Sequence, residues 1–293
     1  MSAQSTFSQT PAYTARLTSQ KEVAAEETLV YEELKRTIVL LETVVKTNAK
    51  EKISRILRTT SKLRKTLSVG QLQQAVGQLL PDQNESKRAL LALLSQISAK
   101  VAVTAKTEDV EMTDATPEAD ASATTPVVVV LPVVDLIEVE VYLFLYVLAA
   151  LMKYKLTAEA LDTVDKVLVR CQQFNRRTLD PFQAKVFSYY SSIHEQFGHD
   201  LSAIRNTLLA AHRTSCLRYD EIGQATLVNL LLRNYLQENL YEQAYKFVSK
   251  TTFPETVSNN QFVRYLYYVG KIQAVQLEYT ESYTKLMQSI RKA

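Results

Sequence analysis

The sequence has 293 residues, 46% of them hydrophobic, with only 5 Gly, 7 Pro and a formal net charge of +3. Proteins built from strands and turns need Gly and Pro, so this scarcity argues against β-rich classes and indicates an all-α chain. The charge is unevenly placed. Residues 1–100 carry 15 Lys and Arg against 9 Asp and Glu, whereas residues 101–135 carry 1 against 7. These changes of sign suggest segments of different character.

Residues 1–20 are rich in Ser, Thr and Gln and lack periodicity, which predicts a flexible tail. Residues 21–102 form a predicted N-terminal helical region, because apolar residues recur there at intervals of three and four. Its helices are expected at residues 22–47, 50–67 and 71–80, with a fourth ending near 101. The fourth is predicted to start with a capping box of Asp82 and Glu85.

One part of this region is strongly basic. Residues 46–67 contain eight Lys and Arg and one Glu. Two interpretations stay open: a surface for nucleic acid or an acidic partner, and a solvated helix face. No aromatic residues lie between the basic ones, so stacking on bases is unsupported and the solvated face is favoured.

Residues 103–126 are acidic and poor in large apolar residues, which predicts a disordered linker. The helical-repeat domain is expected to follow at residues 127–293. Its first part, residues 127–152, is apolar, but Pro132, Asp135, Glu138 and Glu140 interrupt it. A buried core helix is therefore predicted rather than a membrane span, which needs about 20 apolar residues.

The domain predicted for residues 127–293 repeats itself. Helix hairpins are expected to begin near residues 136, 180, 220 and 259, at spacings of 44, 40 and 39 residues. Capping boxes are predicted for Asp180 with Gln183 and for Asn239 with Glu242. A small residue is expected where the second helix of each hairpin approaches the first. The aligned positions are Ala160, Ala203, Ala244 and Tyr283. Because one hairpin cannot cover its own apolar face, the hairpins are expected to stack.

The helix expected within residues 262–279 is apolar on two sides, which predicts that neighbouring repeats bury both. Gly270 lies in its middle. A glycine there lowers helix propensity by about 1 kcal/mol relative to alanine, so it predicts a close helix–helix approach.

Residues for catalysis and metal binding are scarce. His194 and His199 are five apart, not the four that a zinc-binding helix needs, and Gly198 separates them. Cys171 and Cys216 are predicted to be buried, inert thiols in a reducing compartment. No Gly-rich phosphate loop or nucleophile elbow occurs in the sequence, so neither a catalytic site nor a cofactor is predicted.

The candidate binding residues are Arg233, Asn234, Arg264 and Tyr267, which lie on apolar helices of the array. The two arginines could face a groove that holds an acidic peptide. They could equally pair within the chain, with Glu238 or Asp220, and both alternatives stay open.

Residues 223–250, GQATLVNLLLRNYLQENLYEQAYKFVSK, closely resemble the third non-ATPase subunit family of the proteasome regulatory lid. Residues 175–195 and 262–279 support the resemblance, which covers about residues 136–293. It implies a right-handed superhelical array of TPR-like, PCI-type helix hairpins with an N-terminal helical extension. It further implies a scaffold subunit without its own enzymatic activity or cofactor, in the cytoplasm and nucleus.

The partners that the resemblance implies are other lid subunits and a small acidic tethering subunit, with no membrane or nucleic acid. Members of this family continue into a winged-helix PCI segment, whereas this chain stops at Ala293. PCI-mediated assembly is therefore not predicted for these residues. The alternatives are a scaffold subunit of another PCI complex, such as the signalosome or an initiation factor, and an RNA-binding helical repeat.

Overall fold

The computed structural model describes residues 11–47, 49–82, 84–108, 136–197, 201–255 and 257–293, and every regular element within them is an α-helix. The predicted all-α fold class is therefore confirmed. The helices are α1 (Pro11–Thr47), α2 (Lys50–Thr66), α3 (Val69–Leu79), α4 (Glu85–Glu108), α5 (Ile137–Lys153), α6 (Thr157–Gln173), α7 (Asp180–Gln196), α8 (Leu201–Leu217), α9 (Glu221–Gln237), α10 (Tyr241–Lys250), α11 (Asn259–Val275) and α12 (Tyr279–Lys292).

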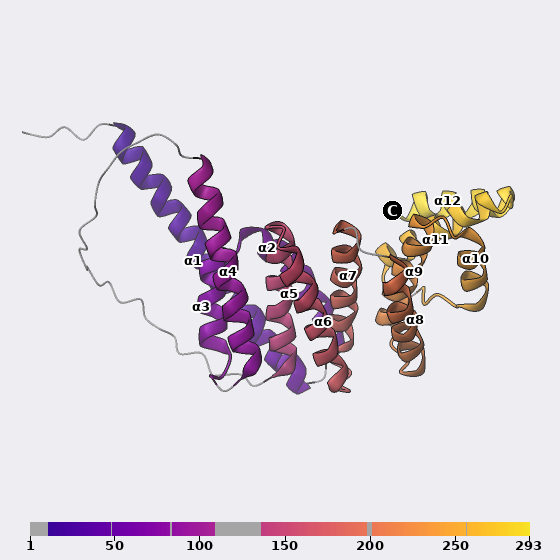
Figure 1. Cartoon of the computed structure of the whole chain (residues 1–293), viewed down its shortest axis with the longest axis horizontal. Helices are drawn as coiled ribbons and strands as arrows, with labels where there is room; N and C mark the ends of the chain where they lie inside the picture. Colours follow the sequence, from indigo (N-terminus) through magenta and orange to yellow (C-terminus); the bar gives the residue numbers. More distant parts are fainter. Residues whose placement is uncertain (1–10, 48, 83, 109–135, 198–200, 256) are drawn as a thin grey trace, which may run out of the picture. The chain divides into compact units, whose positions relative to one another are not determined.

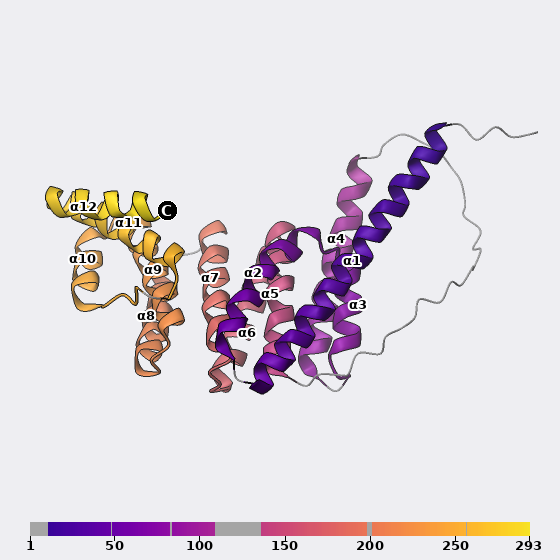
Figure 2. The same ribbon diagram turned by 180° about the vertical axis from the view of Figure 1, so that it is seen from behind.

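The chain divides into two compact units, Met1–Glu140 and Val141–Ala293, and the boundary lies within α5. In the first unit α1 packs against α2, and α3 packs against α4 (Figure 2). The buried residues of α1 include Leu34, Ile38 and Leu41, spaced by four and three, so they lie on one face of the helix. The first unit is thus built from amphipathic helices, as the periodicity predicted.

Two helices of the first unit are longer than predicted. The helix α1 begins at Pro11, so residues 11–20, which we expected in the tail, are helical. Similarly, α4 continues to Glu108, so residues 103–108 of the predicted linker are helical as well. Helix interiors with few large apolar residues give weak periodicity, which explains why both extensions were missed. Residues 1–10 and 109–126, the rest of the predicted tail and linker, lie outside the described residues.

The caps of the first unit also differ from the prediction. The helix α3 starts with a capping box that we did not predict: Ser68 Oγ accepts from the amide of Gln71, and the Gln71 side chain accepts from the amide of Ser68. The box predicted for Asp82 and Glu85 does not form, because α4 begins at Glu85 itself. Asn84 accepts instead from the amide of Ser86, at 3.1 Å.

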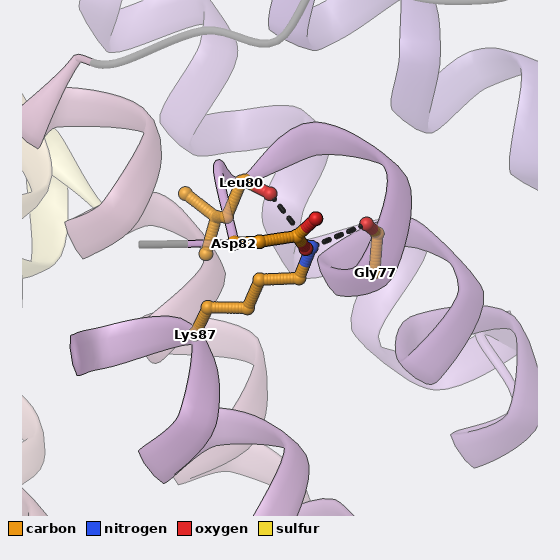
Figure 3. A network of polar contacts seen from close by, with 4 residues as sticks. All are labelled: Gly77, Leu80, Asp82 and Lys87. Carbon is orange, nitrogen blue, oxygen red and sulfur yellow. Dashed lines mark hydrogen bonds and ion pairs between the residues drawn. The ribbon is translucent and has the colours of Figure 1, made fainter. Parts of the chain in front are cut away.

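Asp82 takes part in a different contact, a network around the buried Lys87 (Figure 3). The Lys87 ammonium donates to the carbonyl oxygens of Gly77 at 2.7 Å and Leu80 at 2.8 Å, and to Asp82 Oδ1 at 2.6 Å. An ammonium group has three donors, and here each has an acceptor. Carbonyls at the end of a helix lack intrahelical partners, so Lys87 of α4 caps the C-terminal end of α3.

The predicted hairpins are α5–α6, α7–α8, α9–α10 and α11–α12, and apart from the start of α5 they belong to the second unit. Their first helices begin at residues 137, 180, 221 and 259, so the spacings are 43, 41 and 38 residues. Each hairpin packs against the next: α6 contacts α7, α8 contacts α9, and α10 contacts α11. Figure 1 shows α8 beside α9 and α11 beside α12. This stacking confirms the helical-repeat array.

The helices of three hairpins are joined by the same backbone turn. Lys155, Asn239 and Leu277 have φ values of 55°, 58° and 68°, and each lies two residues before the next helix. The amide that follows each one donates to a carbonyl five residues earlier, for example Leu240 to Tyr235 at 2.9 Å. A left-handed residue with this bond is the Schellman motif, which ends a helix. Asn239 therefore ends α9, and the capping box predicted for Asn239 with Glu242 does not form.

In three of the hairpins the fourth residue of the second helix is small and buried. This residue is Ala160 in α6, Ala244 in α10 and Ser282 in α12, and all three are buried. Two of the four predicted positions are therefore wrong: Ala203 is exposed, and Tyr283 is 65% exposed. A shift of one residue turns a side chain by about 100° around the helix, so a misalignment of one residue exchanges buried for exposed.

The predicted burial of α11 is correct on one side only. Phe262, Leu266, Val269 and Ile272 are buried, but Tyr267 is 50% exposed and Leu277 is 69% exposed. Gly270 is buried, as the predicted close contact requires. The helix α5 is buried nearly all round, and in the described residues no helix is long and apolar enough to cross a membrane.

Candidate protein-interaction surface

The first helices of three successive hairpins lie next to one another, since α9 packs against both α7 and α11. Most of α9 is buried, which leaves a narrow strip with Leu230, Arg233 and Gln237 accessible. On α11, four accessible residues share one face because they are three, four or seven positions apart. We define the α9–α11 surface as Arg233 together with these four residues, Arg264, Tyr267, Tyr268 and Lys271.

Arg233 is anchored by an ion pair. Its guanidinium lies 2.6 Å from a carboxylate oxygen of Glu195 on α7, and the Glu195 side chain is only 9% exposed. Glu195 also accepts a hydrogen bond from Ser191 at 2.9 Å. A buried carboxylate needs such partners, so Arg233 neutralises Glu195 while half of its own side chain remains exposed. The predicted internal partners, Glu238 and Asp220, are wrong because helix packing places α7 against this face of α9.

Asn234 is fully buried and does not reach the surface. Its side-chain oxygen accepts from Arg205 at 3.0 Å, and its amide nitrogen donates to the carbonyl of Leu201 at 2.9 Å. Both partners belong to α8, so Asn234 fastens α9 to α8. Arg205 also binds Glu238 and lies 5.0 Å from the centre of the Tyr235 ring. This network places the adjacent Arg233 on the strip.

Arg264 and Lys271 are exposed cations of α11 that form no ion pair with any described residue. Tyr267 and Tyr268, whose ring centres are 5.7 Å apart, lie between them in the sequence. Burial raises the pKa of the Tyr268 phenol, the positive charges of Arg233 and Arg264 oppose that rise, and Glu195 adds to it. Tyr268 therefore remains a neutral hydrogen-bond donor at physiological pH and lies within the influence of both arginines.

The structure thus brings Arg233, Arg264 and Tyr267 to one surface and places Asn234 beneath it. Tyr268 and Lys271 were not predicted from the sequence. Their spacing from Arg264, four and seven residues, could have identified them as members of the same helix face. A positive surface with exposed phenol rings is suited to acidic polypeptide, because arginine and lysine pair with carboxylates and the rings offer apolar contact.

Residues suited to catalysis or metal binding do not converge in the part of the chain that the structure describes. No group of three or more His, Cys, Asp or Glu that could hold a metal ion occurs there. The His194 ring lies edge-on against Tyr190, at 4.5 Å between centres, while His199 lies outside the described residues. Cys171 is buried and Cys216 is exposed, and both are free thiols, so the predicted burial is wrong for Cys216.

Two comparisons with known proteins match this chain. A family model described as "PSMD3-like, N-terminal TPR repeats" matches residues 26–293. The 26S proteasome non-ATPase regulatory subunit 3 of Dictyostelium discoideum is 38% identical over 289 residues, which cover 98% of this chain and 55% of that protein.

Further relatives carry similar names. The probable 26S proteasome non-ATPase regulatory subunit 3 of Nicotiana tabacum is 39% identical over 264 residues, covering 90% of this chain and 50% of the relative. The probable 26S proteasome regulatory subunit rpn3 of Schizosaccharomyces pombe is 46% identical over 159 residues, which cover 53% and 31%. The chain spans about half the length of the first two of these curated relatives.

Proposed function

Because the chain belongs to the family of 26S proteasome non-ATPase regulatory subunit 3, we propose that it acts as a non-catalytic scaffold subunit in the lid of the 19S regulatory particle. In this role it supports ubiquitin-dependent protein degradation through contacts with other lid subunits. The family match over residues 26–293 is the observation that carries the proposal.

The architecture supports a scaffold role. In the second unit the hairpins bury most of their apolar surface against one another. The same backbone turn joins the two helices of three of these hairpins. Arrays of this kind offer extended surfaces for protein partners. An assembly subunit needs such a surface and a rigid frame beneath it, and the network around Asn234 stiffens that frame.

We assign the α9–α11 surface to the small acidic tethering subunit. Arg264 and Lys271 supply positive charge that no described residue neutralises, and Tyr267 supplies exposed ring area. The exposed half of the Arg233 side chain adds positive charge to the same surface. A short acidic segment laid across α9 and α11 would meet these groups together. The expected location of the assembled protein is the cytoplasm and nucleus, where the proteasome works.

Affinity purification tests the scaffold proposal. The tagged protein is purified at moderate salt from cells of the organism that produces it. The co-purifying chains are then identified by mass spectrometry. The expected result is recovery of several non-ATPase subunits of the regulatory particle in similar amounts. Recovery of another complex, such as the signalosome or an initiation factor, would overturn the proposal, as would recovery of the tagged chain alone.

A further inference from the structure

The helix α2 carries a continuous basic face. Its cations are Lys52, Arg55, Arg58, Lys62 and Lys65, and all five are exposed. At 100° per residue, the last four fall within an arc of about 80°. The opposite side of the helix carries the buried residues Ile53, Ile56, Thr60 and Leu63. We call these five cations the α2 basic face.

Exposed cations on two other helices of the described residues have acidic partners on the same helix. In α1, Arg36 pairs with Glu32 and Lys46 pairs with Glu42; in α6, Lys166 pairs with Asp162. Each of these acids lies four residues before its cation, the arrangement that stabilises a helix.

In α2, Glu51 stands four residues before Arg55. The positions four residues before Arg58, Lys62 and Lys65 hold Ser54, Arg58 and Ser61 instead. None of the five cations forms an ion pair with any residue whose side chain the structure describes. Arg58 and Lys62 are like charges four residues apart, which destabilises a helix. The helix therefore carries repulsion that a negatively charged occupant would relieve.

We propose that the α2 basic face docks the acidic segment at residues 109–120 of the same chain. This segment, DVEMTDATPEAD, contains five carboxylates and no cation. It follows directly after α4, which belongs to the same compact unit as α2. The segment is tethered to that unit, so its effective concentration at α2 is on the order of millimolar without any partner.

The dimensions of the face favour a peptide over nucleic acid. From Lys52 to Lys65 the helix rises about 20 Å, and about six extended residues span that length. The 12-residue segment is therefore long enough to cover the face. A specific nucleic-acid interface buries on the order of 600 Å² or more, and single strands bind largely by stacking on aromatic rings. The α2 basic face is a single helix stripe without an aromatic residue.

Lysine reactivity tests the proposal in the full chain. The variant carries D109N, E111Q, D114N, E118Q and D120N together, and acetylation of Lys62 and Lys65 is followed by mass spectrometry. At about 10 mM salt, where charges act over about 30 Å, these lysines should react several-fold more slowly in the parent than in the variant. At about 1 M salt the difference should vanish. Lys166 and Lys250, outside the face, are internal controls and should react equally in both proteins.

Equal rates for Lys62 and Lys65 in parent and variant at low salt would overturn the proposal. A synthetic peptide of residues 109–120 should also bind the variant at least about threefold more tightly than the parent, whose face is already occupied. A single-stranded RNA oligonucleotide that protects both lysines equally in the two proteins would instead assign the face to nucleic acid and reject the segment. This inference does not depend on the proposed scaffold role, and failed recovery of lid subunits would leave its outcome unchanged.

Discussion

The hydroxyl of Ser282 donates a buried 2.8 Å hydrogen bond to the main-chain carbonyl oxygen of Gly270. The bond joins the middle of α11 to the first turn of α12. Two helix backbones come close enough for such a bond only where both contact positions carry small side chains. A methyl group added at Gly270 would lie 2.8 Å from Leu286 Cγ and 3.4 Å from the Ser282 carbonyl oxygen. The last hairpin is therefore closed by two small residues and one side-chain hydrogen bond.

Gly270→Ala is expected to destabilise the protein by about 1–3 kcal/mol, because overpacking at the Leu286 contact outweighs the gain in helix propensity. Chemical denaturation followed by circular dichroism measures the change. The matched control is Gly77→Ala, at an exposed glycine in α3 where an added methyl group meets nothing within 4 Å. It should be neutral or stabilise by up to about 1 kcal/mol. Equal effects of the two substitutions would contradict the close contact.

Lys87→Met removes the ammonium group that caps α3, and we expect a loss of about 2–4 kcal/mol in unfolding free energy. The carbonyl oxygens of Gly77 and Leu80 lose their donor, and the buried Leu80 carbonyl, left without this donor, carries the cost of desolvation. Asp82→Asn serves as the control. The Asp82 side chain is 95% exposed, so its loss should change stability much less than the loss of the Lys87 ammonium group.

The pH dependence of Asp82 separates its role from that of Lys87. The hydrogen bond and positive charge of Lys87 lower the pKa of Asp82, so the folded state binds its proton less readily than the unfolded state. The small stabilisation is present above the unfolded pKa of about 3.9 and is lost as the pH falls through the lower folded value. Asp82→Asn should therefore reduce the change of the unfolding free energy with pH only below about pH 4. A difference in slope between the two profiles near neutral pH would argue against this assignment.

His212 should make the stability of the second unit sensitive to mild acid. Burial lowers its pKa below the ordinary value, and the ring packs edge-on against Phe247 with the Cys216 sulfur 3.6 Å from Nε2. The unfolded state then binds the proton more readily than the folded state. Stability is fully present above about pH 6.5 and falls as the pH drops toward the folded pKa, by at most about 1.4 kcal/mol per pH unit.

Denaturation midpoints between pH 5 and 7.5 measure this effect. His212→Phe keeps a ring against Phe247 and removes the titrating group, so its midpoint should vary less over this range than that of the parent. Parallel profiles for the two proteins would show that His212 does not carry the effect.

The α9–α11 surface predicts a charge-specific loss of binding. Arg264→Glu combined with Lys271→Glu should weaken binding of a synthetic Asp- and Glu-rich peptide at least about tenfold, or about 1.4 kcal/mol, and leave helicity intact. Fluorescence anisotropy at fixed salt measures the affinity. Lys246→Glu combined with Lys250→Glu places the same charges on the exposed side of α10 and is the control. An equal loss in both double variants would indicate only an effect of net charge.

Arg233 needs separate treatment because of its pair with Glu195. Arg233→Glu would place a second carboxylate beside Glu195, whose side chain is only 9% exposed. Removing the partner of a buried charge costs about 3–5 kcal/mol. The melting temperature should therefore fall for Arg233→Glu and stay unchanged for Arg264→Glu. Equal melting temperatures would contradict the buried ion pair.

Much of the architecture could be predicted from the sequence. The low Gly and Pro content indicated an all-α chain, and the hairpins begin within one residue of the positions expected from the repeat. The mid-helix Gly270 indicated a close contact that the structure contains. These features depend on local patterns, because a periodic stripe or a helix-breaking residue acts on its immediate neighbours wherever the helix packs.

Partners and rotational register were decided only by the tertiary structure. The small contact residue of α12 is Ser282 rather than Tyr283, Arg233 pairs with Glu195 of α7, and Asn234 lies beneath the surface it was expected to line. Each outcome depends on which side of a helix meets its neighbour. A shift of one residue turns a side chain by about 100° around the helix. The partner of Arg233, Glu195, is 38 residues away, and it is determined by how the two helices pack. Sequence periodicity identifies the buried stripe of a helix, whereas only packing determines which neighbour covers it.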